Sequence, residues 1–186
     1  MSRKYIIFLS VCVGCLILDQ ATKWWVVENM AVGEQILIIP GWLSLLHAQN
    51  TGSAFSMMDE FEYRMAVFAV SAILSVGVVA WVLYKLREGE TVATVALGLI
   101  MACAFGNNID RFRFGYVTDF MRNYTEHPSL APWLIERFGT ATWPIWNIAD
   151  ACLVVGVILF LVYSLFLEQT EEATLTEEES LSLAGD

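Results

Sequence analysis

Four long apolar runs, separated by polar stretches, dominate the pattern of residues along the chain. Crossing the hydrocarbon core of a bilayer takes roughly 20 apolar residues in a helix. Residues 65–84 carry no charge at all, and residues 91–105 reach spanning length only if their helix continues to Ile109. We therefore predict four membrane-spanning helices, over residues 5–27, 65–84, 90–109 and 145–167.

The segments between these runs differ in character. Residues 28–64 contain Pro40, three glycines and the strand-prone pieces QILIIP and LSLLHA, which predict a small strand-rich flap on the membrane surface. Residues 84–90 form a very short loop, and residues 122–143 form a polar connection. The predicted fold is an all-α membrane protein with four transmembrane helices in one domain, residues 1–167, that carries this flap.

Composition and charge support a membrane protein. The chain is 57% hydrophobic and only 16% charged, whereas soluble domains carry roughly 25% charged residues. The net charge of −10 arises mainly from residues 168–186, which hold seven acidic residues and no basic one. We expect this tail to be a solvated, disordered extension. Nucleic acid is not an expected partner.

Cysteine and histidine give no sign of a metal or redox site. All four cysteines lie within apolar runs, where a free thiol behaves as a small buried hydrophobe. The two histidines, His47 and His127, have no partner at a ligand spacing. We expect no metal and no cofactor.

Polar residues concentrate in one stretch, Gly106 to Phe120, with the sequence GNNIDRFRFGYVTDF. Lipid penalises such a cluster unless its groups face one another or a wet cavity. A further carboxylate, Asp150, follows Asn147 in the first turns of the last run, and residues three apart share a helix face. Asp119 and Asp150 are therefore the two carboxylates that need an explanation.

The number of spans places these groups on one side of the membrane. With four spans, both chain ends and the 84–90 loop share one side, whereas the flap and residues 110–144 share the other. Arg3 and Lys4 lead the first helix, which usually sets orientation because cytoplasmic flanks are rich in basic residues. More basic residues lie on the opposite side, although Lys23 among them has Asp19 within reach. We expect cytoplasmic termini and an extracytoplasmic flap.

Two carboxylates that are brought together and partly desolvated cannot both ionise easily, so they share a proton. One can then act as a base on water while the other acts as an acid towards a carbonyl. Other interpretations stay open at this point. The polar residues could only hold helices together in a structural subunit, or form the relay of an ion-coupled transporter, although the repeats typical of transporters are absent.

Four motifs resemble those of a known family, the prolipoprotein signal peptidases (signal peptidase II). GNNIDRFRFGYVTDF looks like the family signature G-N-x-x-D-R-x-x-x-G-x-V-x-D-F, and WNIAD looks like its second signature, F/W-N-x-A-D. DQATK resembles the D-x-x-x-K element at the end of helix one, and NTGSAF resembles N-x-G-x-A-F. The likeness runs from about residue 5 to residue 167.

The resemblance implies an intramembrane aspartyl endopeptidase of the bacterial cytoplasmic (inner) membrane, with a small extracytoplasmic β-cradle. Members of the family remove signal peptides from diacylglyceryl-modified prolipoproteins by cutting just before the lipidated cysteine. The implied partners are these substrates and membrane lipid, and we expect a monomer. By motif match Asp119 and Asp150 become the catalytic dyad. The implied substrate-binding or supporting residues are Asn50, Gly52, Asn107, Asp110, Arg111, Asn147, Asp19 and Lys23.

Two features depart from the family pattern. The interval between Asp119 and Asp150, with 30 residues between them, looks longer than is usual for the family. The acidic tail also has no place in the pattern. Neither feature touches a motif residue, so we expect both to alter substrate access or partners and to leave the chemistry unchanged.

Overall fold

The computed structural model describes residues 2–52 and 64–167. Four helices are long and apolar enough to cross a membrane: α1 (Arg3–Asn29), α2 (Arg64–Lys85), α3 (Thr91–Phe114) and α5 (Ile148–Val162), which continues into a short π-helix, η2 (Tyr163–Leu167). The four predicted membrane helices are thus confirmed, and the chain is a multi-pass membrane protein. The predicted tail, and residues 53–63 of the predicted flap, lie outside the described residues.

Helix α3 is the central element of the bundle. In its most apolar stretch of 18 residues, 56% are buried, compared with 11–22% in the corresponding stretches of the other three helices. Small residues allow the neighbouring helices to approach closely. A Cβ at Gly98 of α3 would lie 3.0 Å from the carbonyl oxygen of Phe8 in α1, and one at Gly156 of α5 would lie 2.9 Å from that of Ala96. Helices α1 and α5 are therefore held against α3.

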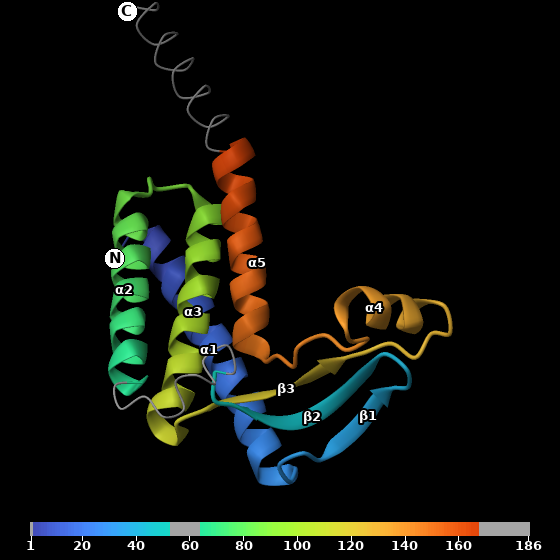
Figure 1. Cartoon of the computed structure of the whole chain (residues 1–186). Coiled ribbons are helices and arrows are strands. Elements are labelled where there is room, and N and C mark those ends of the chain that lie inside the picture. Colours follow the sequence, from blue (N-terminus) through green and yellow to red (C-terminus); the bar gives the residue numbers. More distant parts are fainter. Residues whose placement is uncertain (1, 53–63, 168–186) are drawn as a thin grey trace, which may run out of the picture.

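The sheet lies at one end of the bundle, opposite the α2–α3 connection (Figure 1). It consists of β1 (Gln35–Ile39), β2 (Leu43–Asn50) and β3 (Val117–Asn123), which pair antiparallel in that order. The predicted flap supplies the first two strands, so the small β-element is confirmed. The third strand, which the sequence analysis did not predict, comes from the polar stretch after α3. Its first four residues are all buried, so it lacks the alternation that marks a half-exposed strand.

A fifth helix, α4 (Leu130–Phe138), lies within the segment that was predicted only as a polar connection. It has nine residues and contains Pro132, so neither its length nor its composition marks it as a helix. Proline is tolerated in the first turn because the backbone N–H groups there have no partner within the helix. Figure 1 shows α4 above the sheet, to the side of the bundle and at the level of the lower end of α5.

Capping residues set two helix boundaries that differ from the prediction. Helix α3 continues five residues beyond Ile109 and ends where Gly115 adopts a left-handed conformation (φ 80°), which glycine adopts without steric cost. Helix α5 begins at Ile148 because the side chain of Asn147 caps it. As a result, Asn107, Asp110 and Arg111 lie on a helix, and Asp150 lies in the first turn of the next one.

Candidate active site

Asp119 lies in β3, next to the end of β2, and is only 3% exposed. Both of its carboxylate oxygens accept hydrogen bonds from asparagine side chains. Asn50 Nδ2 of β2 donates to Oδ2 (2.8 Å), and Asn147 Nδ2 donates to Oδ1 (2.6 Å). The strand pairing and the start of α5 together fix the position of this carboxylate.

Asp150 is held by the cap of α5. Its backbone N–H donates to Asn147 Oδ1 (3.1 Å), and its Oδ2 accepts from the backbone N–H of Asn147 (3.2 Å). This reciprocal pair is a capping box, with aspartate in place of the usual glutamate or glutamine. Its Oδ1 accepts from Asn107 Nδ2 (2.9 Å). Asn147 therefore binds both Asp119 and Asp150, and the structure brings the two carboxylates together.

Asn107 of α3 links these carboxylates to a buried cation. Its Oδ1 accepts from Asn147 Nδ2 (3.1 Å) and from Lys23 Nζ (2.9 Å). Lys23 Nζ in turn lies 3.0 Å from Asp19 Oδ2 and 3.1 Å from Asp110 Oδ2. All three charged residues are at most 3% exposed. The positive charge of Lys23 compensates two buried carboxylates, and their burial would destabilise the fold without it.

Asp19 and Asp110 also hold the elements that carry the dyad. Asp19 Oδ1 accepts from the backbone N–H of Ala149 in the first turn of α5 (2.9 Å), where helix N–H groups lack partners and favour negative charge. Asp110 Oδ2 accepts from the backbone N–H of Thr118 (3.0 Å), one residue before Asp119. The supporting carboxylates thus fix the backbone on which the dyad sits.

Gln20 belongs to this network although the sequence analysis did not select it. Its Nε2 lies within hydrogen-bond distance of Asp110 Oδ1 (3.1 Å), Asp19 Oδ2 (3.2 Å) and the carbonyl oxygen of Gly106 (3.2 Å). The only available signal was its place inside the DQATK motif, next to Asp19. A polar side chain at that place in an apolar run requires a partner.

Two other predicted site residues have different surroundings. The backbone N–H of Gly52, at φ +88°, donates to Asn50 Oδ1 (2.9 Å) and so orients the amide that contacts Asp119. Residues 53–55 of the NTGSAF motif lie outside the described residues. Arg111 packs its guanidinium over the ring of Phe68, 5.0 Å from the centroid. Within the described part of the chain, Arg111 makes no ion pair or side-chain hydrogen bond with the polar network.

The surroundings of Asp119 raise its pKa from 3.8 to about 6. Burial is the largest cause because it disfavours the charged carboxylate. The charge of Asp150 raises the pKa further, whereas the hydrogen bonds from Asn50 and Asn147 lower it. Asp119 therefore keeps a proton at a pH where an exposed aspartate is ionised.

This pKa shift predicts a pH-dependent contribution to stability. A carboxyl whose pKa is higher in the folded protein binds its proton more tightly when folded, so its contribution to the free energy of unfolding falls as pH rises from 3.8 to about 6 and then levels off. We expect thermal unfolding in detergent to show this fall for the wild type relative to Asp119→Asn. A difference between the two proteins that stays constant over this range would contradict the assignment.

The dyad opens onto two cavities. One, of about 310 Å³, lies beside Asp119 and is lined by Ala48, Gln49, Asn50, Thr51, Pro144 and Ile145 as well. The other, of about 610 Å³, includes Asp150 and extends over Trp42, Asn123, Trp143, Trp146, Ala151, Val154 and Val155. An extended peptide can therefore reach the carboxylates from the sheet, and an apolar group can reach them from α5.

Gly106 provides a test of how tightly this network is packed. A Cβ there would lie 2.5 Å from Asp19 Oδ2, and the ion pair with Lys23 prevents that oxygen from moving freely. We expect Gly106→Ala to lower the free energy of unfolding by about 1–3 kcal/mol, because overpacking displaces the paired charges. Thermal unfolding in detergent measures this loss.

Gly77→Ala is the matched control, because Gly77 lies in α2 and a Cβ there meets no atom within 4 Å. This variant should be neutral or slightly stabilised, since alanine favours a helix by up to about 1 kcal/mol. Equal effects of the two substitutions would show that Asp19 adjusts without cost.

Comparisons with known proteins agree with this arrangement. The model of the family described as signal peptidase (SPase) II matches residues 11–166. A lipoprotein signal peptidase of Geobacter sulfurreducens is 38% identical over 162 residues, which cover 87% of this chain and 93% of that protein. One of Listeria welshimeri is 35% identical over 159 residues, which cover 86% and 90%.

A solved structure of a bacterial membrane enzyme superposes with a TM-score of 0.71 at 28% identity, and the match covers 86% of this chain and 92% of that one. A second such structure gives a TM-score of 0.69 at 27% identity, with coverage of 88% and 90%. These matches set aside the transporter and structural-subunit interpretations. The chain is a membrane peptidase and belongs to the signal peptidase II family.

Proposed function

We propose that this protein removes signal peptides from diacylglyceryl-modified prolipoproteins by cutting just before the lipidated cysteine, with Asp119 and Asp150 activating water. The observation that carries the proposal is the shared contact with Asn147, whose side chain binds Asp119 and whose backbone binds Asp150. The relatives described above are named lipoprotein signal peptidases, which supports this substrate class.

The chemistry requires one proton on the pair. We assign this proton to Asp119, because burial raises the pKa of that carboxyl to about 6. Asp150 then accepts a proton from water as the water oxygen attacks the scissile carbonyl, while Asp119 donates its proton to the carbonyl oxygen. When the tetrahedral intermediate collapses, the C–N bond breaks and the leaving amine takes the proton that Asp150 received. Asp119 recovers its own proton, so the pair returns to its initial state.

The remaining site residues support this step. Asn50, oriented by Gly52, lies in the cavity beside Asp119 and is placed to hold the substrate backbone there. Asn147 and Asn107 orient the two carboxylates. Lys23, with Asp19 and Asp110, fixes the positions of α1, α3, β3 and the start of α5 relative to one another. The packing of Arg111 on Phe68 supports the contact between α3 and α2.

The membrane placement and assembly state belong to the same proposal. The active site would face the extracytoplasmic side of the bacterial inner membrane, with the chain termini in the cytoplasm and the protein acting as a monomer. Lys4 Nζ donates to the carbonyl oxygens of Tyr84 (3.3 Å) and Leu86 (2.5 Å). These contacts tie the start of α1 to the α2–α3 connection, as expected if both lie on one membrane face.

Cleavage of a defined precursor tests the function. Purified protein in detergent should cut a diacylglyceryl-modified precursor before its cysteine, and mass spectrometry of the two products locates the cut. The same precursor without the lipid is the control, and it should be cut far more slowly even at saturating concentration. Equal rates for both precursors, or a cut at another bond, would overturn the proposed specificity.

A further inference from the structure

A groove runs over the sheet from the base of α5 to α4. The cavity beside Asp150 shares Trp42, Asn123 and Trp143 with a second cavity of about 490 Å³. The two cavities adjoin at these three residues, and together we call them the α4 groove. Its α4 end is lined by Leu130, Leu134 and Phe138, which lie four residues apart on one face of that helix.

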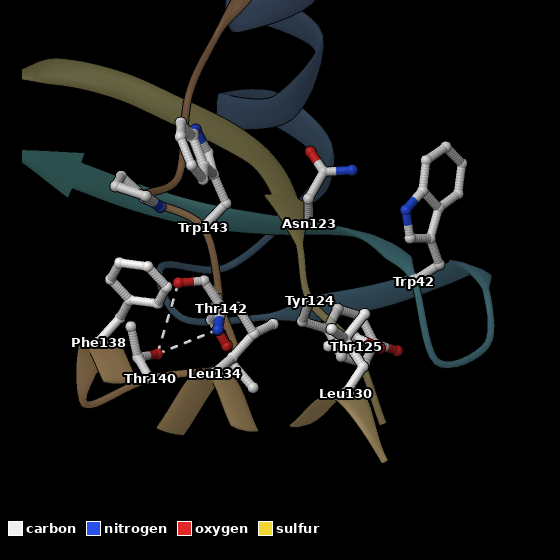
Figure 2. A pocket seen from close by; sticks show the side chains of 12 residues that line it. Trp42, Asn123, Tyr124, Thr125, Leu130, Leu134, Phe138, Thr140, Thr142 and Trp143 are labelled. Carbon is white, nitrogen blue, oxygen red and sulfur yellow. Dashed lines mark hydrogen bonds between the residues drawn. The ribbon is translucent and has the colours of Figure 1, made fainter. Parts of the chain in front are cut away.

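The lining of the α4 end is mainly apolar. The hydroxyl of Thr140, one of the polar groups in this lining, is occupied locally because it accepts from the backbone N–H of Thr142 (3.0 Å) and lies 3.4 Å from the carbonyl oxygen of the same residue. Figure 2 shows this pair beside the side chains of Leu134 and Phe138, with Trp143 on the other side of the cavity. An apolar cavity of this size offers water few partners and suits a hydrocarbon ligand.

Asn123 lies where the two cavities meet, and Figure 2 shows its amide between Trp143 and Trp42. Its Oδ1 accepts a hydrogen bond from Trp146 Nε1 (2.9 Å). Its Nδ2 has no partner in the described part of the chain. The junction therefore offers the Nδ2 amide group of Asn123 as a hydrogen-bond donor beside the indole rings of Trp42 and Trp143, and an ester carbonyl is an acceptor that fits this arrangement.

The other end of the groove contains both Asp150 and the outer face of α5. Val154 and Val155 are 58% and 48% exposed on a helix that crosses the membrane, so this end is open to lipid. A cysteine whose preceding bond is cut at the dyad would place its glyceryl group close to Asp150. An acyl chain attached to that group has two directions: along α5 into the bilayer, or past Asn123 towards α4.

On the basis of the proposed function, we propose that the α4 groove binds one acyl chain of the diacylglyceryl group on the substrate. In this arrangement Asn123 donates to an ester carbonyl, and Leu130, Leu134 and Phe138 contact the end of the chain. Helix α4 lies in the long interval between Asp119 and Asp150. That interval would then serve to select the length of the acyl chain.

Two neighbouring substitutions on α4 test the proposal. Leu134 lines the groove, whereas Ile135 is 53% exposed and does not. We expect Leu134→Trp to fill the groove and to lower kcat/KM about tenfold for a precursor with long acyl chains, the equivalent of one or two buried methylenes. For a precursor with short chains the change should be less than about twofold. Ile135→Trp, the matched control, should leave both values within about twofold.

Several outcomes would overturn the acyl-chain site and leave the proposed function intact. Normal cleavage by Leu134→Trp with an unchanged preference for chain length is one, and an equal loss for both chain lengths is another. A wild-type protein that cuts no lipidated precursor would instead refute the proposed function itself.

Photocrosslinking tests occupancy without turnover. A precursor with a photoreactive group at the end of one acyl chain should label the peptide that contains residues 130–138, and excess lipidated precursor should compete with this labelling. Labelling confined to α5 would overturn the proposal. Equal competition by bilayer phospholipid would assign the groove to a membrane lipid and would also overturn it.

Discussion

Replacing either Asp119 or Asp150 by asparagine is expected to lower kcat for a lipidated precursor by about a thousandfold or more. Proton transfer by a positioned group contributes roughly 10²–10⁴-fold, and the proposed mechanism uses one transfer at each carboxylate. An amide cannot take up or deliver the proton. The amide oxygen can, however, still accept the hydrogen bond that each aspartate receives from Asn147. The measurement is single-turnover cleavage of the diacylglyceryl-modified precursor.

Folding must be measured together with activity in these variants. Both variants should stay folded in detergent, with a modest loss of stability. The amide oxygen keeps the hydrogen bond from Asn147, but the amide nitrogen faces a donor, Nδ2 of Asn50 in one variant and Nδ2 of Asn107 in the other. Glu126→Gln is the matched control, since it neutralises an exposed carboxylate in the segment that follows β3. Either dyad variant retaining near-normal turnover would refute the proposed mechanism, whereas loss of activity in Glu126→Gln would show that the effect is not specific to the dyad.

Replacing Lys23 by methionine is expected to produce the largest loss of stability. The substitution keeps most of the apolar stem but leaves Asp19 and Asp110 without their cation, at sites that are at most 2% exposed. Removing one partner of a buried ion pair costs about 3–5 kcal/mol. Activity should fall as well, because Lys23 Nζ donates to Asn107, which holds Asp150. Thermal unfolding and cleavage assays on the same preparation measure both effects.

A double variant separates charge from shape in this prediction. Lys23→Met combined with Asp110→Asn has one buried negative charge fewer than Lys23→Met alone, and the asparagine oxygen can still accept from the backbone N–H of Thr118. We expect the double variant to recover part of the lost stability. If it were less stable than the single variant, the loss would come from packing rather than from uncompensated charge.

The sequence was sufficient for the helices because lipid imposes a strict length and composition on a span. Residues 65–84 illustrate this, since an uncharged run of that length has few alternatives to a membrane helix. The two strands of the flap were also predictable from their β-prone pieces. Strand β3 and helix α4 were not, because the first four residues of β3 are all buried, without alternation, and α4 is short and contains Pro132.

The sequence also selected most of the polar cluster. Asp19, Lys23, Asn107, Asp110, Asn147 and Asp150 lie in apolar runs or at their ends, where a polar residue needs a partner. Counting spans placed these groups on one membrane face but left open which groups meet. Arg111 shows the limit of this reasoning. It lies in the same motif, yet its guanidinium contacts Phe68 and lies outside the polar network.

What the sequence by itself determined is the number of spans, the face on which the polar residues gather and the two carboxylates that need explaining. All three follow from the cost of placing polar groups in lipid, which acts residue by residue along the chain. The motif resemblance named Asp119 and Asp150 together, but the contacts that join them were decided only by the tertiary structure. They depend on Asn147 capping α5 while reaching β3, and hydrogen bonds between elements 28 residues apart in sequence leave no local pattern.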